Sequence, residues 1–229
     1  MSQTPRTATA FAPATVANVA VGFDVMGFSF AELGDLVTVE RVDDPDPEGA
    51  VVLDWVRGAD FEGDQDLPSN PKENTATRAL AAMVDDLDLA HWFRVRLEKG
   101  IPIGSGMGGS AASAVGAVVA GAALVDQSIP RAQLLRYALV GEAAASGSAD
   151  GGALAHGDNV APCLFGGLCC YLPNDPPEVV EIPVPSGLSC VLVRPRLRQD
   201  TRAQRAMLRD SVSVKDFVLQ SAHLAGFIA

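Results

Sequence analysis

Apolar positions along the chain recur with two periods, one typical of strands and one typical of helices. Strict alternation predicts a half-buried strand over 92–97, and Ala and Leu at helical spacing predict a helix over 74–87. The segment 28–42 reads as one long strand or a bent pair. Together these patterns indicate an α+β protein. The same reasoning predicts further strands over 7–12, 51–56, 163–171, 179–184 and 189–194, and further helices over 111–125, 131–142, 201–208 and from 214 onward.

Composition narrows the class of protein further. At 229 residues the chain can bury one large core or two small ones. Pro183, Pro185 and Gly187 cluster at an expected boundary, which divides the chain into domains 1–184 and 185–229. No apolar run reaches the length of a membrane span, and the first residues lack a signal-peptide pattern. We therefore expect a soluble, cytoplasmic protein that does not bind membranes.

The net charge of −11 is unevenly distributed. Acidic residues crowd 43–66, which argues against nucleic-acid binding. Six arginines lie within 194–209, mostly as a solvated helix face, and one or two of them could hold an anionic substrate group. The cysteines at 163, 169, 170 and 190 lack the spacing of a metal site, so reduced and mostly buried thiols are expected.

The most informative segment is 102–113, which reads Pro-Ile-Gly-Ser-Gly-Met-Gly-Gly-Ser-Ala-Ala-Ser and leads into a predicted helix. Glycines let backbone N–H groups approach an anion closely, and a helix N-terminus adds a partial positive charge. The segment therefore predicts a cradle for phosphate groups. A flexible turn before a buried helix is the alternative interpretation.

Two common phosphate-binding motifs do not account for this loop. Gly104, Gly106 and Gly109 satisfy the spacing G-x-G-x-x-G, and Asp126 falls about 20 residues beyond the loop. A dinucleotide-binding unit needs a second strand that ends in this acidic residue, yet Asp126 lies at a helix end and a further helical pattern follows. Walker A is excluded because no Gly-Lys-Ser/Thr follows the loop.

Three segments in order resemble the GHMP small-molecule kinases, and within them the homoserine kinase branch. They are an opening motif over 12–28, the phosphate loop over 102–113, and 156–167, which reads His-Gly-Asp-Asn-Val-Ala-Pro-Cys-Leu-Phe-Gly-Gly. The resemblance implies an N-terminal ribosomal-protein-S5-like α/β subdomain and an incomplete C-terminal ferredoxin-like α+β subdomain. It also implies ATP-dependent phosphorylation of the side-chain hydroxyl of L-homoserine to O-phospho-L-homoserine, a step of threonine biosynthesis.

ATP and Mg²⁺ are the cofactors that this resemblance implies. Ser110 and Glu142 are the expected metal ligands, with a helix N-cap and an exposed helix-end glutamate as the respective alternatives. Asn74 resembles the residue that contacts the adenine or ribose, and it could equally be a plain N-cap. The family commonly has a serine where Gly109 stands. The residues expected to bind the nucleotide are Asn74, Pro102, Ile103, Gly104, Ser105, Gly106, Met107, Gly108, Gly109, Ser110, Ala111 and Ala112.

An amino-acid substrate needs an arginine for its carboxylate and a carboxylate for its ammonium group. Arg205 is expected in the first role, and Asp24, expected to be buried among apolar residues, in the second. Asn159 fits a catalytic asparagine near the attacking hydroxyl, and His156 could instead be a core histidine. No general base is evident, and none of the three lysines lies in a motif. The expected substrate contacts are Asn18, Asp24, His156, Asp158, Asn159, Thr201 and Arg205.

The chain stops at Ala229 inside an apolar helical pattern, and the family's third glycine-rich motif is not found. We therefore expect a C-terminally incomplete chain with little activity of its own. Its exposed apolar face would favour self-association, a homodimer included. Three functions stay open: a homoserine kinase, another GHMP kinase acting on a small alcohol, and a non-catalytic nucleotide-binding homologue. The polar residues around the expected substrate argue against a hydrophobic one.

Overall fold

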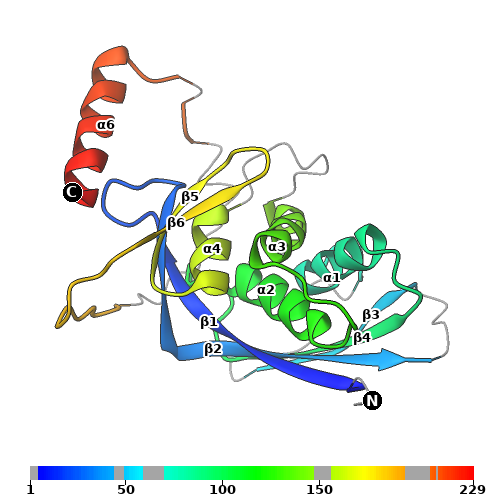
Figure 1. The fold of residues 1–229 in the computed structure, drawn as a ribbon. Coiled ribbons are helices and arrows are strands. Elements are labelled where there is room, and N and C mark those ends of the chain that lie inside the picture. Colours follow the sequence, from blue (N-terminus) through cyan, green and yellow to red (C-terminus); the bar gives the residue numbers. More distant parts are fainter. Residues whose placement is uncertain (1–4, 44–48, 59–69, 147–155, 194–206, 210) are drawn as a thin grey trace.

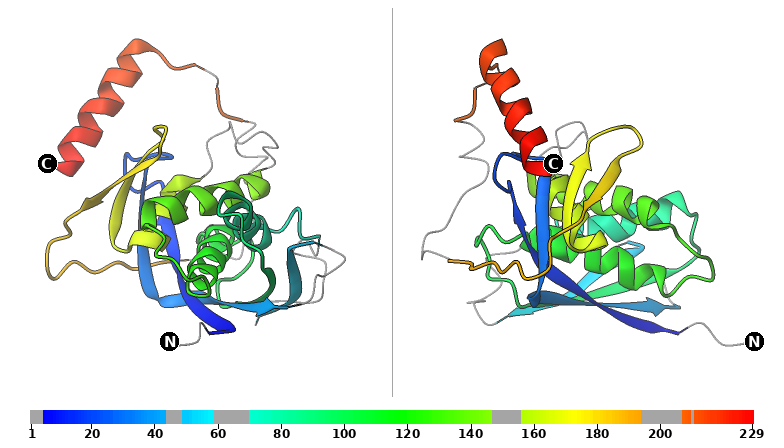
Figure 2. Two further views of the ribbon diagram at one scale, coloured as in Figure 1. Left: turned by 45° about the vertical axis from the view of Figure 1, so that its right-hand side comes forward. Right: turned by 60° about the vertical axis from the view of Figure 1, so that its left-hand side comes forward.

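The computed structural model describes residues 5–43, 49–58, 70–146, 156–193, 207–209 and 211–229. A bent sheet forms one layer, and helices α1 to α4 cover one of its faces (Figures 1 and 2). The strands are β1 (Thr7–Ala17), β2 (Met26–Val42), β3 (Val51–Gly58), β4 (Trp92–Lys99), β5 (Leu168–Leu172) and β6 (Glu178–Ile182). The helices are α1 (Thr75–Asp86), α2 (Gly109–Ala122), α3 (Arg131–Ser146), α4 (Gly157–Phe165) and α6 (Val214–Ile228).

Strand β2 organises the sheet because it pairs with three other strands. The order is β3-β4-β2-β5-β6, and β1 also pairs with β2. β1 runs antiparallel to β2, with a register shift between Pro13 and Ala14. β4 pairs with the second half of β2, and β5 pairs with its first residues. The segment predicted over 28–42 is therefore one long strand rather than a bent pair.

Alternation along β2 and β4 places one set of side chains beneath the helices. Val37, Val39 and Val95 belong to this set, and all three are fully buried. Helix α2 approaches the sheet closely because its residues are small: a Cβ on Gly116 would lie 2.4 Å from Cγ2 of Val37. This close packing against β1 and β2 fixes the position of α2 and of the loop that precedes it.

The predicted strand over 163–171 is wrong in its first half. Helix α4 continues to Phe165, and β5 begins only at Leu168. Gly166 and Gly167 separate the two elements with φ angles of 87° and 61°, a conformation that ends a helix. α4 packs against β1, β2 and β5, so tertiary packing overrides a local sequence that is rich in apolar residues.

Two further predictions near the end of the chain have different outcomes. The strand predicted over 189–194 is not formed in its described part, where Val191 and Val193 are exposed. Alternation produces a strand only where a neighbouring strand and a core receive it. The helix predicted over 201–208 lies outside the described residues, except for Met207 and Leu208, which are not helical. The final helix begins at Val214, as predicted.

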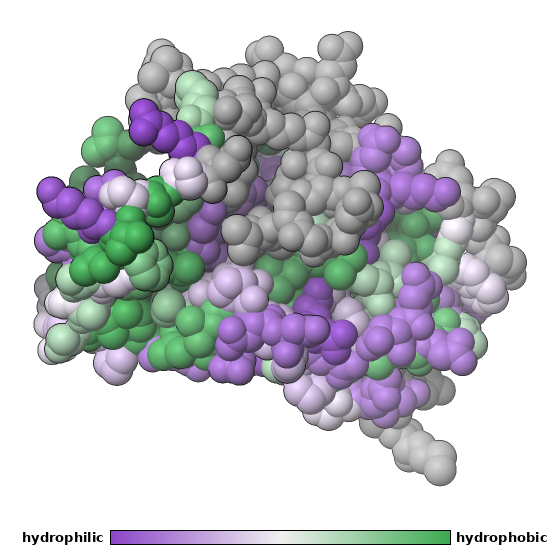
Figure 3. All heavy atoms as spheres, turned by 90° about the horizontal axis from the view of Figure 1, so that it is seen from above, coloured by the Kyte–Doolittle hydropathy of each residue, from purple (hydrophilic) through white to green (hydrophobic). Residues whose placement is uncertain are grey.

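Helix α6 lies apart from the helical layer (Figure 2). Gln220 on α6 donates a hydrogen bond to the carbonyl of Val21 in the loop after β1. Phe217, Leu219 and Phe227 on this helix are exposed, and Figure 3 shows apolar surface on this side of the molecule. Among the described residues, none of the helices combines the length and apolar character that crossing a bilayer requires.

Candidate active site

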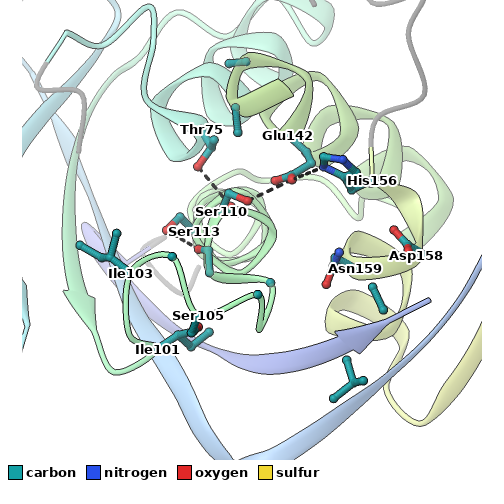
Figure 4. Close-up of a pocket in the computed structure, with 18 of the residues that line it drawn as sticks. Thr75, Ile101, Ile103, Ser105, Ser110, Ser113, Glu142, His156, Asp158 and Asn159 are labelled. Atoms are coloured by element: carbon teal, nitrogen blue, oxygen red, sulfur yellow. Dashed lines mark hydrogen bonds and ion pairs between the residues drawn. The ribbon is translucent and has the colours of Figure 1, made fainter. Parts of the chain in front are cut away.

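A cavity of about 980 Å³ opens between the end of β1, the loop after β4 and the helices α1 to α4 (Figure 4). This size suits a small-molecule ligand. Ala111 and Ala112 do not line the cavity because they are buried in the core, and Met107, which packs against the core, does not line it either. Thr201 and Arg205 lie outside the described residues. The predicted residues that do line the cavity are Asn18, Asp24, Asn74, Pro102, Ile103, Gly104, Ser105, Gly106, Gly108, Gly109, Ser110, Glu142, His156, Asp158 and Asn159.

The loop before α2 has the backbone geometry of an anion-binding site. Gly104, Gly106 and Gly108 have φ angles of 66°, 73° and 68°. Left-handed residues that alternate with others turn successive N–H groups towards one side. α2 begins at Gly109, and the first N–H groups of a helix have no helical carbonyl to bond. Loop and helix N-terminus therefore form one concave surface with a partial positive charge.

A buried carboxylate lies beside this surface. Glu142 on α3 is 2% exposed, which excludes the alternative of an exposed helix-end glutamate. The Ser110 hydroxyl donates to its Oε1 at 3.0 Å, and Nδ1 of His156 lies 3.1 Å from the same oxygen (Figure 4). The N-cap of α2 is Gly108, so the alternative of Ser110 as a cap is wrong. Ser110 and Glu142 thus present oxygen atoms at the helix N-terminus.

The sequence offered two alternative roles for Asn74, a contact to the nucleotide and a helix N-cap. Its Oδ1 accepts hydrogen bonds from the N–H groups of Ala76 at 3.0 Å and Thr77 at 3.4 Å, which makes it the N-cap of α1. The same residue also lines the cavity. Capping fixes the side chain of Asn74 at the cavity wall. A contact between Asn74 and the nucleotide stays a prediction.

The loop after β1 brings two polar residues to the cavity. Asn18 and Asp24 have φ angles of 55° and 59°, and such left-handed conformations are most common for Asn and Asp among non-glycine residues. The N–H of Asp24 donates to Oδ1 of Asn18 at 2.9 Å. Asp24 is half-buried, so the expectation of a buried carboxylate is wrong. The loop carries this side chain to the mouth of the cavity instead of into the core.

Helix α4 supplies the remaining predicted residues. His156 precedes its first turn, and Asp158 and Asn159 lie within that turn. Asp158 is 1% exposed, whereas Asn159 is half-buried and accepts a hydrogen bond from the Thr15 hydroxyl at 2.7 Å. The cavity therefore has an anion-binding end, at the loop, and a polar wall formed by the loop after β1 and the start of α4.

Sequence reasoning missed a buried ion pair behind the loop. Nζ of Lys99 donates to the carboxylate of Asp35 and, at 2.7 Å, to the carbonyl of Gly109 at the start of α2. Asp35 also accepts the N–H groups of Gly100 and Ile101, each at 3.0 Å. Burial lowers the pKa of Lys99, and Asp35 opposes this shift. The pair ties the end of β4 and the start of α2 to β2.

The alternation of buried residues along β2 and β4 could have predicted this ion pair. Lys99 follows Val95 and Leu97 at a spacing of two residues, on the buried face of β4. Asp35 stands in the same way two residues before Val37, on the buried face of β2. Because a buried charge needs a partner, two opposite charges on the inner faces of paired strands predict an ion pair.

Comparisons with known proteins agree on one family. Residues 74–167 match the N-terminal domain of the GHMP kinases. A homoserine kinase of Xylella fastidiosa (strain M12) is 44% identical over 227 residues, which cover 99% of this chain and 65% of the relative. A homoserine kinase of Chloroherpeton thalassium is 33% identical, and the match covers 96% of this chain and 68% of the relative. The crystal structure of a homoserine kinase from Cytophaga hutchinsonii has a TM-score of 0.83 and 32% identity, covering 100% of this chain and 68% of that one.

The matched residues 74–167 include the glycine loop, the start of α2 and the buried Glu142. With 33% identity over 68% of a relative's length, the chain belongs to the homoserine kinase family. The resemblance and the fold class expected from the sequence are thereby confirmed. The chain spans 65% of the length of the Xylella relative. The division into domains 1–184 and 185–229 stays a prediction.

Proposed function

We propose that the protein transfers the γ-phosphoryl group of ATP to the side-chain hydroxyl of L-homoserine, giving O-phospho-L-homoserine, ADP and a proton. One observation carries this proposal: an anion-binding loop and a wall of small polar residues face the same cavity. The relatives at 44% and 33% identity are homoserine kinases. The reaction would serve threonine biosynthesis in the cytoplasm, where the free thiols of all four cysteines are stable.

The loop is suited to the phosphates of ATP. Its backbone N–H groups and the N-terminus of α2 offer positive charge without a basic side chain. Phosphoryl transfer needs positioning and charge neutralisation more than covalent chemistry, and a rigid loop supplies positioning. The ion pair of Lys99 and Asp35 supports this rigidity, because it bonds to the backbone on both sides of the loop.

Mg²⁺ fits the residues beside the loop. This ion prefers oxygen ligands and is commonly held by one or two carboxylates together with substrate phosphates. Glu142 and Ser110 offer a carboxylate and a hydroxyl there. Among the described residues, no group of three or more His, Cys, Asp or Glu side chains gathers as a metal site. When bound, Mg²⁺ would neutralise the charge that develops on the transferring phosphoryl group.

The polar wall is suited to an amino acid with a hydroxyl side chain. Asp24 would bind the ammonium group, because its carboxylate reaches the cavity. Asn159 would hold the acceptor hydroxyl, with Asn18, His156 and Asp158 completing the wall. For the substrate carboxylate we propose Arg205 with Thr201, two residues outside the described part of the chain.

Replacing Gly108 by alanine should abolish most of the ATP affinity. A Cβ at this position would lie 2.0 Å from Oγ1 of Thr15, and the residue has a φ of 68°. Left-handed backbone costs about 1–2 kcal/mol for a residue with a Cβ, before the clash is counted. We expect ATP affinity, measured by isothermal titration calorimetry, to fall at least about tenfold.

Gly109→Ala is the matched control for this variant. A Cβ at Gly109 would meet only ordinary contacts, with Cγ2 of Ile101 at 3.5 Å. ATP affinity should therefore stay within about twofold of the parent, since no anion-binding N–H group moves. A folded Gly108→Ala protein with the parent's ATP affinity would show that the loop does not bind the phosphates.

Replacing Asp24 by asparagine should weaken L-homoserine binding and leave ATP binding unchanged. The exchange keeps the shape of the side chain and its tolerance of a positive φ, and it removes only the charge. Because Asp24 is half-buried, we expect a loss of about tenfold, less than for a fully buried pair. Calorimetric titration of the full-length protein with L-homoserine and, separately, with ATP measures both effects.

Asp88→Asn controls for the substitution itself. Asp88 also has a positive φ, 48°, but it is exposed and does not line the cavity. Its exchange should leave both affinities unchanged. Equal homoserine affinities in Asp24→Asn and the parent would remove Asp24 from the substrate site.

A further inference from the structure

Thr15 lies on β1 behind the cavity wall, and it is fully buried. Its hydroxyl donates to Oδ1 of Asn159 on α4 at 2.7 Å. Its backbone N–H donates to the carbonyl of Met107, in the glycine loop, at 3.1 Å. Thr15 does not line the cavity, so it acts on a ligand only through other residues. One buried residue thus bonds to both the phosphate-binding loop and the side chain proposed to hold the acceptor hydroxyl.

In the structure the oxygen of the Asn159 amide faces Thr15 and accepts its hydroxyl proton. An amide group has an acceptor oxygen on one side and an NH₂ donor on the other. Since the oxygen accepts the Thr15 proton, the nitrogen is turned away from β1. Figure 4 shows this nitrogen on the side of Glu142, within the cavity. Asn159 therefore presents a hydrogen-bond donor to whatever occupies the cavity.

The glycine loop packs directly on this pair of side chains. A Cβ at Gly108 would lie 2.0 Å from Oγ1 of Thr15 and 2.9 Å from Oδ1 of Asn159. The hydrogen bond is consequently shielded from the cavity by the backbone that would bind the phosphates. Thr15 thus contacts the amide through its hydroxyl group and the loop through its backbone N–H group.

We propose that Thr15 is a positioning residue that holds Asn159 with its NH₂ group towards the acceptor hydroxyl. This inference rests on the proposed phosphorylation of L-homoserine. Asn159 then serves as a donor to the hydroxyl oxygen, and it orients that oxygen towards the phosphoryl group. An amide that donates in this way does not remove the hydroxyl proton; as the new P–O bond forms and the bond to ADP breaks, that proton is released to solvent.

The test is a double-mutant cycle in the full-length protein, with turnover and KM measured for ATP and L-homoserine. Thr15→Val removes the hydroxyl and nearly keeps the volume, so kcat should fall about tenfold while KM for ATP stays within about threefold. Thr15→Ser keeps the hydroxyl and should retain kcat within about threefold. Asn159→Ala should lower kcat at least as much as Thr15→Val, and the double variant should be no slower than Asn159→Ala, because Thr15 acts only through Asn159.

A second variant keeps the test independent of how Thr15 variants fold. Asn159→Asp retains an oxygen for the Thr15 hydroxyl and replaces the NH₂ donor by a second oxygen. It should be as slow as Asn159→Ala. The inference is overturned by an Asn159→Asp protein as fast as the parent, by a folded Thr15→Val protein with unchanged kcat, or by losses that multiply in the double variant. Failure of the proposed function would instead appear in the parent protein, as no phosphorylation of L-homoserine.

Discussion

Replacing Glu142 by glutamine is expected to lower turnover by at least about two orders of magnitude, because charge neutralisation and positioning carry most of phosphoryl transfer. The exchange keeps the size of the side chain and its place beside the loop. It removes the negative charge that the buried carboxylate offers next to the Ser110 hydroxyl. Steady-state turnover of the full-length protein over a range of Mg²⁺ concentrations measures the effect.

Glu73→Gln is the matched control for Glu142→Gln. Glu73 lines the same cavity, but it is exposed and accepts a hydrogen bond from Asn70 at 3.3 Å. Its loss should change turnover by no more than about threefold, since an exposed charge is screened by solvent. If turnover of Glu142→Gln equalled that of the parent at limiting Mg²⁺, Glu142 would have no part in metal binding.

Replacing Lys99 by methionine should destabilise the protein by about 3–5 kcal/mol, because it leaves the buried carboxylate of Asp35 without its charged partner. Asp35 is fully buried and holds the backbone of Gly100 and Ile101, so the loss would reach the phosphate-binding loop. Exchanging both charged residues, as in Lys99→Met with Asp35→Leu, should recover part of the stability. Urea unfolding followed by circular dichroism measures these free energies.

Arg96→Met provides a comparison on the opposite face of the same strand. Arg96 bonds to Glu40 and Asp54 at 2.6 and 2.7 Å, but its side chain is 29% exposed. Its removal should cost no more than about 1 kcal/mol, as for other partly exposed ion pairs. A Lys99→Met protein as stable as Arg96→Met would mean that the buried pair does not support the loop.

The parts of the site that the sequence predicted are those in which local chemistry decides the structure. Glycines at 104, 106 and 108 adopt left-handed conformations because other residues rarely do, and the helix after them follows from its own pattern. Glu142 could be selected because a carboxylate among small apolar residues needs a role. Each of these inferences requires only a few neighbouring residues.

The parts that were missed depend on contacts between distant segments. Lys99 and Asp35 are 64 residues apart, and only the pairing of β2 with β4 brings them together. The sequence of residues 163–165 fits a strand as well as a helix, and packing against the sheet selects the helix. The expectation that Asp24 is buried was wrong. An apolar stretch of sequence can form a loop at the mouth of a cavity as well as part of a core.

The most direct test of the account is the identity of the phosphorylated product. The full-length protein is incubated with ATP, Mg²⁺ and one alcohol at a time, among them L-homoserine, mevalonate and galactose, and products are followed by ³¹P NMR. We expect O-phospho-L-homoserine to form with one equivalent of ADP, and no phosphate ester to form from the other alcohols. Phosphorylation of a different alcohol in preference to L-homoserine, or no phosphoryl transfer to any of them, would contradict the proposed function.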